Sequence, residues 1–164
     1  MILIALGANL DHPRYGPPRE TLEAALEALQ QSGVAILGRS RWFRSAPTPP
    51  SEQPWFVNAV ASAETSLSPA DLLAKLHEIE AGFGRVRHRA NEARVLDLDL
   101  LAYHDRESAP GESPILPHPR LAERAFVVLP LAEVAPDWRH PVSGLSAAEM
   151  ANRLDPAETA EPLD

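Results

Sequence analysis

The sequence contains no cysteine and a single lysine, Lys75, among its 164 residues. The absence of cysteine excludes disulfide bonds, thiol nucleophiles and cysteine-ligated zinc, and it fits a reducing cytoplasm. No run of 18 apolar residues is present, and the N-terminus lacks the basic segment of a signal peptide, so neither a membrane span nor a leader is expected. The patterns GxxxxGK[ST] and GxGxxG are missing too, so neither a P-loop nor a Rossmann site is indicated.

Basic residues are also scarce. The chain has 15 Lys and Arg against 23 Asp and Glu, a net charge of −8 with histidine neutral. Proteins that bind nucleic acids or anionic membranes generally carry a basic surface, so we expect neither partner, and any anionic ligand must be held by local charge. The preference for arginine over lysine suits forked contacts with phosphate, although the base composition of a GC-rich genome gives the same preference.

The length and composition fit one domain. Hydrophobic residues make up 45% of the chain, enough for a substantial core. We expect a single domain over residues 1–153, followed by a loose acidic tail over residues 154–164, because the tail has few apolar side chains to bury.

Apolar periodicity predicts strands and helices in the order β-α-β-β-α-β, followed by further helices. Strands are expected over residues 2–6, 34–37, 56–63 and 95–103, and helices over residues 21–31, from Ser68 to near Gly82, and over residues 122–131, where Pro130 limits the last one. This order is typical of a ferredoxin-like α+β sandwich, in which helices pack on an antiparallel sheet.

The segment Arg94-Val95-Leu96-Asp97-Leu98-Asp99-Leu100-Leu101 carries the sharpest chemical signal. Side chains alternate on a strand, so both aspartates fall on one face and the leucines between them on the other. Two carboxylates about 7 Å apart in a largely buried strand call for a cation, and hard carboxylate oxygens suit Mg²⁺ together with substrate phosphates. An exposed strand face with two solvated acids is the alternative.

A basic stretch precedes these acids. Arg85, Arg87, Arg89 and Arg94 lie within ten residues that contain only one acid, Glu92. Arginines beside an acidic pair are what a site for a metal and a triphosphate needs, because they neutralise the phosphate oxygens that the metal leaves uncovered. A solvated surface loop is the alternative.

Two further clusters are ambiguous when taken alone. His118 lies between two prolines and could donate a hydrogen bond to a phosphate, or it could bond a backbone carbonyl in a structural role. Phe56 and Asn58 share a strand face after the proline-rich loop 45–51, where they could stack on and hydrogen-bond a flat heterocycle. A core phenylalanine and a loop-stabilising asparagine would look the same.

Taken in order, the segments resemble the 6-hydroxymethyl-7,8-dihydropterin pyrophosphokinases of folate biosynthesis. The resemblance runs from about Ile2 to Pro136, and the order and spacing of its motifs make it specific. The motifs are Leu6-Gly7-Ala8-Asn9-Leu10, Phe43-Arg44-Ser45-Ala46-Pro47, Gln53-Pro54-Trp55-Phe56-Val57-Asn58-Ala59, Glu78-Ile79-Glu80 with Gly84-Arg85-Val86-Arg87, Arg94 with Leu96-Asp97-Leu98-Asp99, and Pro117-His118-Pro119 with Arg124 and Phe126.

The resemblance implies a ferredoxin-like fold and the transfer of pyrophosphate from ATP to the hydroxymethyl group of the pterin, with AMP released and two Mg²⁺ ions as cofactors. It implies that Asp97 and Asp99 hold the metals and form the catalytic set with Arg85 and Arg94. The implied ATP-binding residues are Glu80 on the nucleotide side, Arg85, Arg94, Leu100, His118 and Arg124. The implied pterin-binding residues are Ser45, Ala46 and Thr48 in the loop, Asn58 at the edge of the ring, and Phe56 and Phe126 on its two faces. ATP and the pterin are then the expected partners of a cytoplasmic monomer.

The sequence departs from the family pattern just before the acidic pair. The family usually has Trp-Gly-Pro-Arg there, in a loop that closes over the ligands, and this chain has Asn91-Glu92-Ala93-Arg94. Val95 and Pro119 also replace a usual threonine and a frequent aromatic residue. None of these changes removes an implied metal ligand or phosphate arginine, so activity is expected. A catalytically weak homologue that binds pterin or nucleotide is one alternative. A ferredoxin-like RNA-binding module is the other, and it would need exposed aromatic residues and a basic sheet face.

Overall fold

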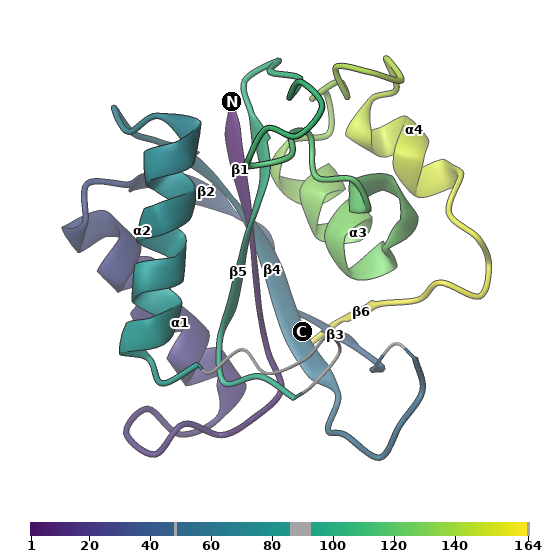
Figure 1. Cartoon of the computed structure of the whole chain (residues 1–164). Coiled ribbons are helices and arrows are strands. Elements are labelled where there is room, and N and C mark those ends of the chain that lie inside the picture. Colours follow the sequence, from purple (N-terminus) through teal and green to yellow (C-terminus); the bar gives the residue numbers. More distant parts are fainter. Residues whose placement is uncertain (48, 86–92, 164) are drawn as a thin grey trace.

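The computed structural model describes residues 1–47, 49–85 and 93–163 as one antiparallel sheet with helices on both faces (Figure 1). The elements are β1 (Ile2–Ala8), α1 (Pro18–Gln31), β2 (Ala35–Arg39), β3 (Phe43–Ser45), β4 (Phe56–Glu64), α2 (Pro69–Gly82), β5 (Asp97–Tyr103), the 3-10 turn η1 (Leu121–Glu123), α3 (Ala125–Val134), α4 (Ala147–Asn152) and β6 (Glu161–Pro162). The expected β-α-β-β-α-β order and the antiparallel α+β sandwich are confirmed, with β3 as a short additional strand between β2 and β4.

The sheet has the strand order β5-β1-β4-β3-β6, and β2 also pairs with β4. β1 runs between β4 and β5, antiparallel to both, with Gly7 opposite Asn58 on one side and Asp97 on the other. This register brings β4 and β5, which are far apart in the sequence, to either side of one glycine.

Two hydrophobic cores hold the layers together, one on each face of the sheet. Ile4, Leu98 and Leu76 belong to the core under α1 and α2, whereas Leu3 and Val128 belong to the core under α3 and α4. Consecutive residues Leu3 and Ile4 enter opposite cores because side chains alternate along a strand. Since Leu98 faces α1 and α2, its neighbours Asp97 and Asp99 face the side of α3.

Local signals explain where α2 begins and ends. The Ser68 hydroxyl accepts a hydrogen bond from the Asp71 N–H at 3.2 Å, and Pro69 occupies the first turn. After the helix ends, Gly84 takes a φ of +95°, a conformation that favours glycine. The Arg85 N–H then donates back to the Glu80 carbonyl at 3.1 Å, so the chain leaves α2 with Arg85 beside the last turn of the helix.

The prediction for α3 was wrong at Pro130. The helix continues through this proline to Val134 instead of ending there. Pro130 costs the helix one backbone hydrogen bond, but Val127, Val128 and Leu131 are buried in the core, and their burial offsets that loss.

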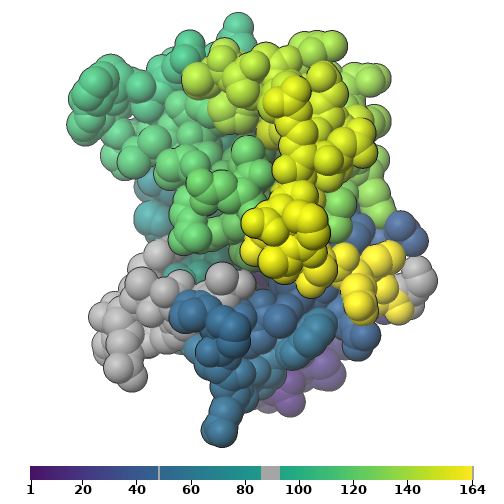
Figure 2. Space-filling view, turned by 90° about the vertical axis from the view of Figure 1, so that its right-hand side faces the viewer, coloured from purple at the N-terminus to yellow at the C-terminus, as the bar shows by residue number. Residues whose placement is uncertain are grey.

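The C-terminal segment, expected to be a loose tail, contacts the edge of the sheet in the structure. β6 pairs with β3, the Leu163 N–H donates to the Trp42 carbonyl at 2.9 Å, and Glu161 forms an ion pair with Arg44 at 2.8 Å. Figure 2 shows the segment lying across one face of the molecule. The expectation rested on the lack of apolar side chains, but the segment contacts the sheet through backbone pairing and charged side chains, which do not require apolar residues. The domain boundary at residue 153 and the looseness of the tail stay predictions.

No helix within the described part of the chain combines the length and apolar character needed to cross a bilayer.

Candidate active site

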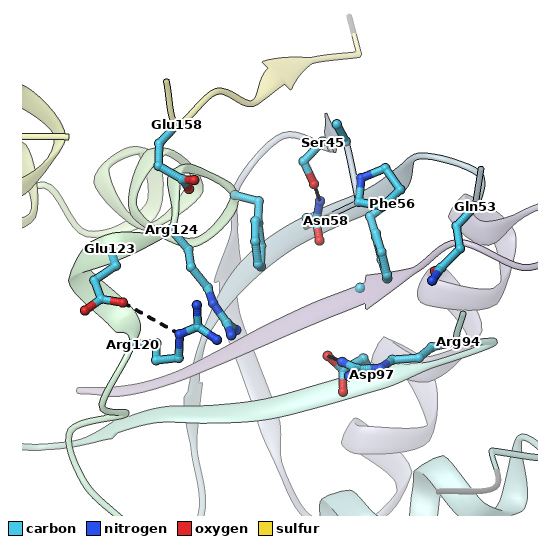
Figure 3. Close-up of a pocket in the computed structure, with 14 residues that line it drawn as sticks. Ser45, Gln53, Phe56, Asn58, Arg94, Asp97, Arg120, Glu123, Arg124 and Glu158 are labelled. Atoms are coloured by element: carbon cyan, nitrogen blue, oxygen red, sulfur yellow. Dashed lines mark hydrogen bonds and ion pairs between the residues drawn. The ribbon is translucent and has the colours of Figure 1, made fainter. Parts of the chain in front are cut away.

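A pocket of about 220 Å³ opens on the α3 face of the sheet, where β1, β4 and β5 lie side by side (Figure 3). It is lined by Gly7, Ser45, Ala46, Pro47, Gln53, Phe56, Asn58, Arg94, Asp97, Arg120, Glu123, Arg124, Phe126 and Glu158. The pocket therefore joins residues from the ambiguous aromatic–amide cluster to residues from the acidic strand and its arginines.

One end of the pocket is formed by the start of β4 and the end of β3. Asn58 is buried, and its Nδ2 donates to the Ser45 Oγ at 2.8 Å. This bond fixes the amide so that its carbonyl oxygen lies on the pocket side (Figure 3). Gly7 forms the adjoining floor, and a Cβ atom there would lie 3.0 Å from the Asn58 Oδ1. An alanine at this position would therefore require the amide to shift by a few tenths of an ångström.

Aromatic rings line the same end from two elements. Phe56 comes from β4 and Phe126 from α3, and both are half-buried rather than sealed in a core. The Arg124 guanidinium lies 5.5 Å from the centroid of the Phe126 ring. Two half-exposed rings beside a fixed amide form a surface suited to a flat heterocycle with hydrogen-bonding edges.

The other end of the pocket is formed by charged side chains that are ion-paired with one another. The Asp97 carboxylate is bonded by the Arg85 guanidinium and, at 2.9 Å, by the Arg94 Nη1. Arg85 also forms an ion pair with Glu80 at 2.7 Å, and Glu80 accepts the Leu98 N–H at 2.7 Å. Burial acts to lower the pKa of Arg85, but the attraction of Asp97 and Glu80 outweighs it, so the pKa is raised and the guanidinium stays charged.

Asp99 differs from Asp97 in its charge balance. Burial, followed by repulsion from Asp97 and Glu80, raises the pKa of Asp99 to about 7, although the positive charges of Arg94 and Arg124 oppose the shift. The two carboxylates are not a solvated strand face, since neither is exposed. A cation placed between them would relieve the repulsion.

The donor set fits a Mg²⁺ ion that also binds phosphate. No cluster of three or more His, Cys, Asp or Glu side chains with metal-binding geometry occurs among the described residues. Two carboxylates alone leave most positions of an octahedral ion to other oxygens, and substrate phosphates and water are the usual donors for Mg²⁺.

Arg94 is placed by a buried asparagine. The Asn9 side chain accepts the Arg94 N–H at 2.7 Å and donates to the Gln53 side chain at 3.1 Å and to the Pro54 carbonyl at 3.0 Å. Among the described residues, the buried Nε of Arg94 has no hydrogen-bond partner. The sequence showed Asn9 only as part of a motif and gave no sign that it joins Arg94 to the loop before β4.

His118 and Arg124 extend the positive end of the pocket. His118 Nδ1 accepts the Arg120 N–H at 3.2 Å, which places the proton of the neutral ring on Nε2. Burial, followed by the nearby charge of Arg124, lowers the pKa of His118, so the ring is neutral near pH 7 and can donate from Nε2. Burial, followed by repulsion from Arg120, also lowers the pKa of Arg124.

Several residues predicted for the site do not line the pocket. Glu80 and Arg85 lie beneath it in the ion-pair network, and Asp99 and His118 lie beside it. The Leu100 side chain is buried in the core under α1 and α2. The Leu98 N–H points away from β1, toward Glu80. Backbone N–H and C=O groups alternate between the two sides of a strand, so those of Leu100, two residues further along, point to the same outer edge. Any contact of Leu100 with a nucleotide therefore has to be made by its backbone.

Some predicted residues lie outside the described part of the chain. These are Thr48 and, in the basic stretch and altered loop, Arg87, Arg89, Asn91 and Glu92.

Other lining residues were missed. Four of them lie within or beside the motifs named above, and that proximity could have suggested them: Gly7, Pro47, Gln53 and Arg120. Glu123 could have been suggested in the same way, because it precedes Arg124. Glu158 lies in the tail, where the sequence carried no signal of a site.

Comparisons with known proteins agree on one family. The family model described as 7,8-dihydro-6-hydroxymethylpterin-pyrophosphokinase (HPPK) matches residues 3–136. The 2-amino-4-hydroxy-6-hydroxymethyldihydropteridine pyrophosphokinase of Haemophilus influenzae is 44% identical over 82% of this chain and 81% of its own length. The proteins of the same name from Methylorubrum extorquens and Synechocystis are each 38% identical, over 94% and 93% of this chain and 93% and 75% of their own lengths.

Solved structures show the same fold. The Plasmodium falciparum HPPK-DHPS structure with pteroate superimposes with a TM-score of 0.72 at 12% identity, over 93% of this chain and 44% of that one. This chain thus spans less than half of that protein, and the likeness concerns the fold alone.

Proposed function

The chain belongs to the 7,8-dihydro-6-hydroxymethylpterin-pyrophosphokinase family, and we propose that it transfers pyrophosphate from ATP to 6-hydroxymethyl-7,8-dihydropterin within this pocket. It is an ATP-dependent diphosphotransferase of folate synthesis, with ATP and the hydroxymethyl pterin as substrates.

The aromatic end of the pocket binds the pterin in this proposal. Phe56 and Phe126 provide ring faces, and the fixed Asn58 amide offers a carbonyl acceptor to the N–H groups at the pterin edge. Ser45 and Ala46 complete the wall with backbone groups. These groups are neutral, which suits an uncharged ring. A ligand that leaves one of the buried polar groups without a hydrogen bond would bind more weakly than the pterin.

The charged end binds the triphosphate. The guanidinium groups of Arg94 and Arg124 line this end, and the Nε2–H of His118 adds a donor near Arg124. Arg85 contributes by fixing Asp97 and by adding charge from below. The guanidinium group of arginine can form two parallel hydrogen bonds to phosphate oxygens. Arginines that are already in position stabilise the negative charge that develops during transfer, because they do not have to reorient.

Asp97 and Asp99 would hold Mg²⁺, and we propose two ions. When bound, the metal neutralises the phosphate charges and draws the oxygens into place. The protein holds the two carboxylates on one strand face and keeps Arg85 and Arg94 beside them, so the ligands are set before the nucleotide arrives.

The reaction is a displacement at the β-phosphorus. The hydroxymethyl oxygen forms a bond to that phosphorus, the bond from the phosphorus to the bridging α–β oxygen breaks, and AMP leaves with the bridging oxygen. The hydroxyl proton is lost as the new ester forms. Positioning and charge neutralisation supply most of the rate in such transfers, and both are built from the two ends of one pocket.

The observation that carries the proposal is that a single pocket joins the Asn58 and Phe56 surface to Asp97 and Arg94. The test is an assay of AMP and pterin diphosphate formed from ATP, Mg²⁺ and the hydroxymethyl pterin. Equal amounts of the two products are expected, with none when Mg²⁺ is chelated. A folded sample, checked by its thermal transition, that forms neither product would refute the proposal.

The alternatives are less well supported. An RNA-binding module needs an open sheet face, whereas helices cover both faces of this sheet (Figure 1). A weak homologue would be expected to lack a metal ligand or a phosphate arginine, and the described pocket contains both kinds of residue. The monomeric state and the cytoplasmic location stay predictions.

A further inference from the structure

The first turn of α3 is capped from the tail. Its N-cap residue, Arg124, makes no capping hydrogen bond with its side chain. Instead, the Glu158 Oε1, 33 residues downstream, accepts the N–H of Ala125, the first residue of the helix, at 3.1 Å. A carboxylate at a helix N-terminus satisfies a backbone donor and interacts favourably with the helix dipole.

This contact lies in the wall of the pocket. The residues on either side of Ala125 are Arg124 and Phe126, both of which line the pocket, as does Glu158 itself (Figure 3). A change in the direction of the first turn of α3 would therefore move one aromatic face and one arginine together.

The same segment is attached to the opposite wall. β6 pairs with β3, and the Glu161–Arg44 ion pair lies beside this pairing. β3 ends at Ser45, whose hydroxyl holds the Asn58 amide. Residues 158–163 therefore bridge from the α3 wall to the β3 wall, across one end of the pocket.

We propose that Glu158 is a positioning residue that sets the spacing between the Phe126 wall and the Asn58 wall, and thereby the affinity for the pterin. The inference rests on the proposed function, because it takes the pterin as the occupant of the space between these walls. It concerns a residue outside the segment 3–136 that matches the family model.

The effect falls on the pterin rather than on phosphoryl transfer. Among the described residues, the hydrogen bonds and ion pairs of residues 158–163 to other elements run to α3, to β3 and to Trp42 just before it, and none runs to β5 or α2, which carry Asp97 and Glu80. Loss of one cap bond corresponds to about a fivefold change in an equilibrium constant, which is the expected size of the effect.

The experiment measures kcat and the KM values for pterin and ATP in the full-length protein and three variants. Glu158→Ala removes the acceptor, and we expect the pterin KM to rise about fivefold while kcat stays within about twofold. Because Arg124 moves with Phe126, the ATP KM should rise as well, but by a smaller factor, since Arg85 and Arg94 lie outside α3. Glu158→Gln keeps an acceptor oxygen, and we expect it to restore most of the pterin KM.

Glu149→Ala is the matched control. Glu149 closes the capping box of α4 by accepting the Ser146 N–H at 3.1 Å, away from the pocket. We expect this variant to lower the thermal transition as Glu158→Ala does but to leave the pterin KM unchanged.

The outcomes separate the two proposals. If the wild type is active and Glu158→Ala has a wild-type pterin KM, or shifts it no more than Glu149→Ala, the positioning role is refuted while the proposed function stands. If the folded wild type shows no turnover, the proposed function itself fails.

Discussion

The two ends of the pocket are preorganised in opposite ways. At the pterin end, a neutral amide is fixed by a neutral hydroxyl, Asn58 to Ser45, and flanked by half-buried rings. At the phosphate end, Asp97 is bonded by two arginines, whereas the pKa of the partly buried Asp99 is raised by burial and by repulsion from Asp97 and Glu80. The neutral end has no charge to balance, whereas the charged end holds a repulsion between carboxylates that a bound cation, or a proton on Asp99, relieves.

The largest effect should come from the two acids, and it should also distinguish them. Asp97→Asn and Asp99→Asn should each lower kcat by about 10³-fold or more, because each removes charge that the metal needs. The thermal transition should fall in Asp97→Asn, since Arg85 and Arg94 lose an ionic partner, and should not fall in Asp99→Asn. Turnover assays and melting curves of both variants test this, and near-normal turnover in either variant would reject the metal assignment.

Substitution of Arg94 should show that the rate of phosphoryl transfer and the affinity for the pterin can be changed separately. Arg94→Ala is expected to lower kcat by about 10²-fold while changing the dissociation constant of the pterin by less than about threefold, because its guanidinium is paired with Asp97 at the phosphate end. Single-turnover rates and pterin titrations measure the two quantities. Equal losses in both would place Arg94 in the pterin end instead.

Asp99 should also make stability depend on pH. Its pKa in the folded protein, about 7, lies above the ordinary value of 3.8, so the folded state binds the proton more tightly than the unfolded state. This contribution to stability is fully present below pH 3.8 and is lost as the pH rises through 7.

In chelator, Asp99→Asn should therefore be more stable than the wild type at pH 8, by up to about 4 kcal/mol or about 8–16 °C, and the advantage should shrink by pH 5. Melting temperatures of both proteins across this range test the shift. A constant difference between them would mean that Asp99 does not titrate there.

The smallest effect should come from the floor of the neutral end. Gly7→Ala places a methyl group 3.0 Å from the Asn58 Oδ1 and should displace the amide without removing any pterin contact. We expect the pterin KM to rise about fivefold with the ATP KM unchanged. Gly82→Ala is the control, because a Cβ at Gly82 meets no atom within 4 Å. If Gly7→Ala binds pterin as the wild type does, the amide is not held as tightly as the structure implies.

Local rules predicted much of the fold and part of the site. Strand alternation alone placed Asp97 and Asp99 opposite the leucines and put Phe56 on the same face as Asn58. These predictions hold because alternation is a property of the extended backbone and does not depend on what packs against it. The resemblance named most of the pocket residues, and the structure brings Ser45, Ala46, Phe56, Asn58, Arg94, Asp97, Arg124 and Phe126 into one cavity.

The same rules failed where stability came from distant partners. Pro130 does not end α3, because the buried side chains around it hold the helix on the sheet. The C-terminal segment was expected to be loose for lack of apolar side chains, and in the structure its backbone pairs with the edge of β3. Neither fact can be read from the composition of the segment concerned.

The sequence by itself therefore determined the order of the elements, the faces on which side chains lie and the family to which the chain belongs. Only the tertiary structure decided that Glu80 supports Arg85, that Asn9 ties Arg94 to the loop at Pro54, and that Glu158 caps α3. The physical reason is that periodicity reports the near neighbours of a residue. Contacts between residues 33 or 85 positions apart form only when burial of two hydrophobic cores has fixed the layers that carry them.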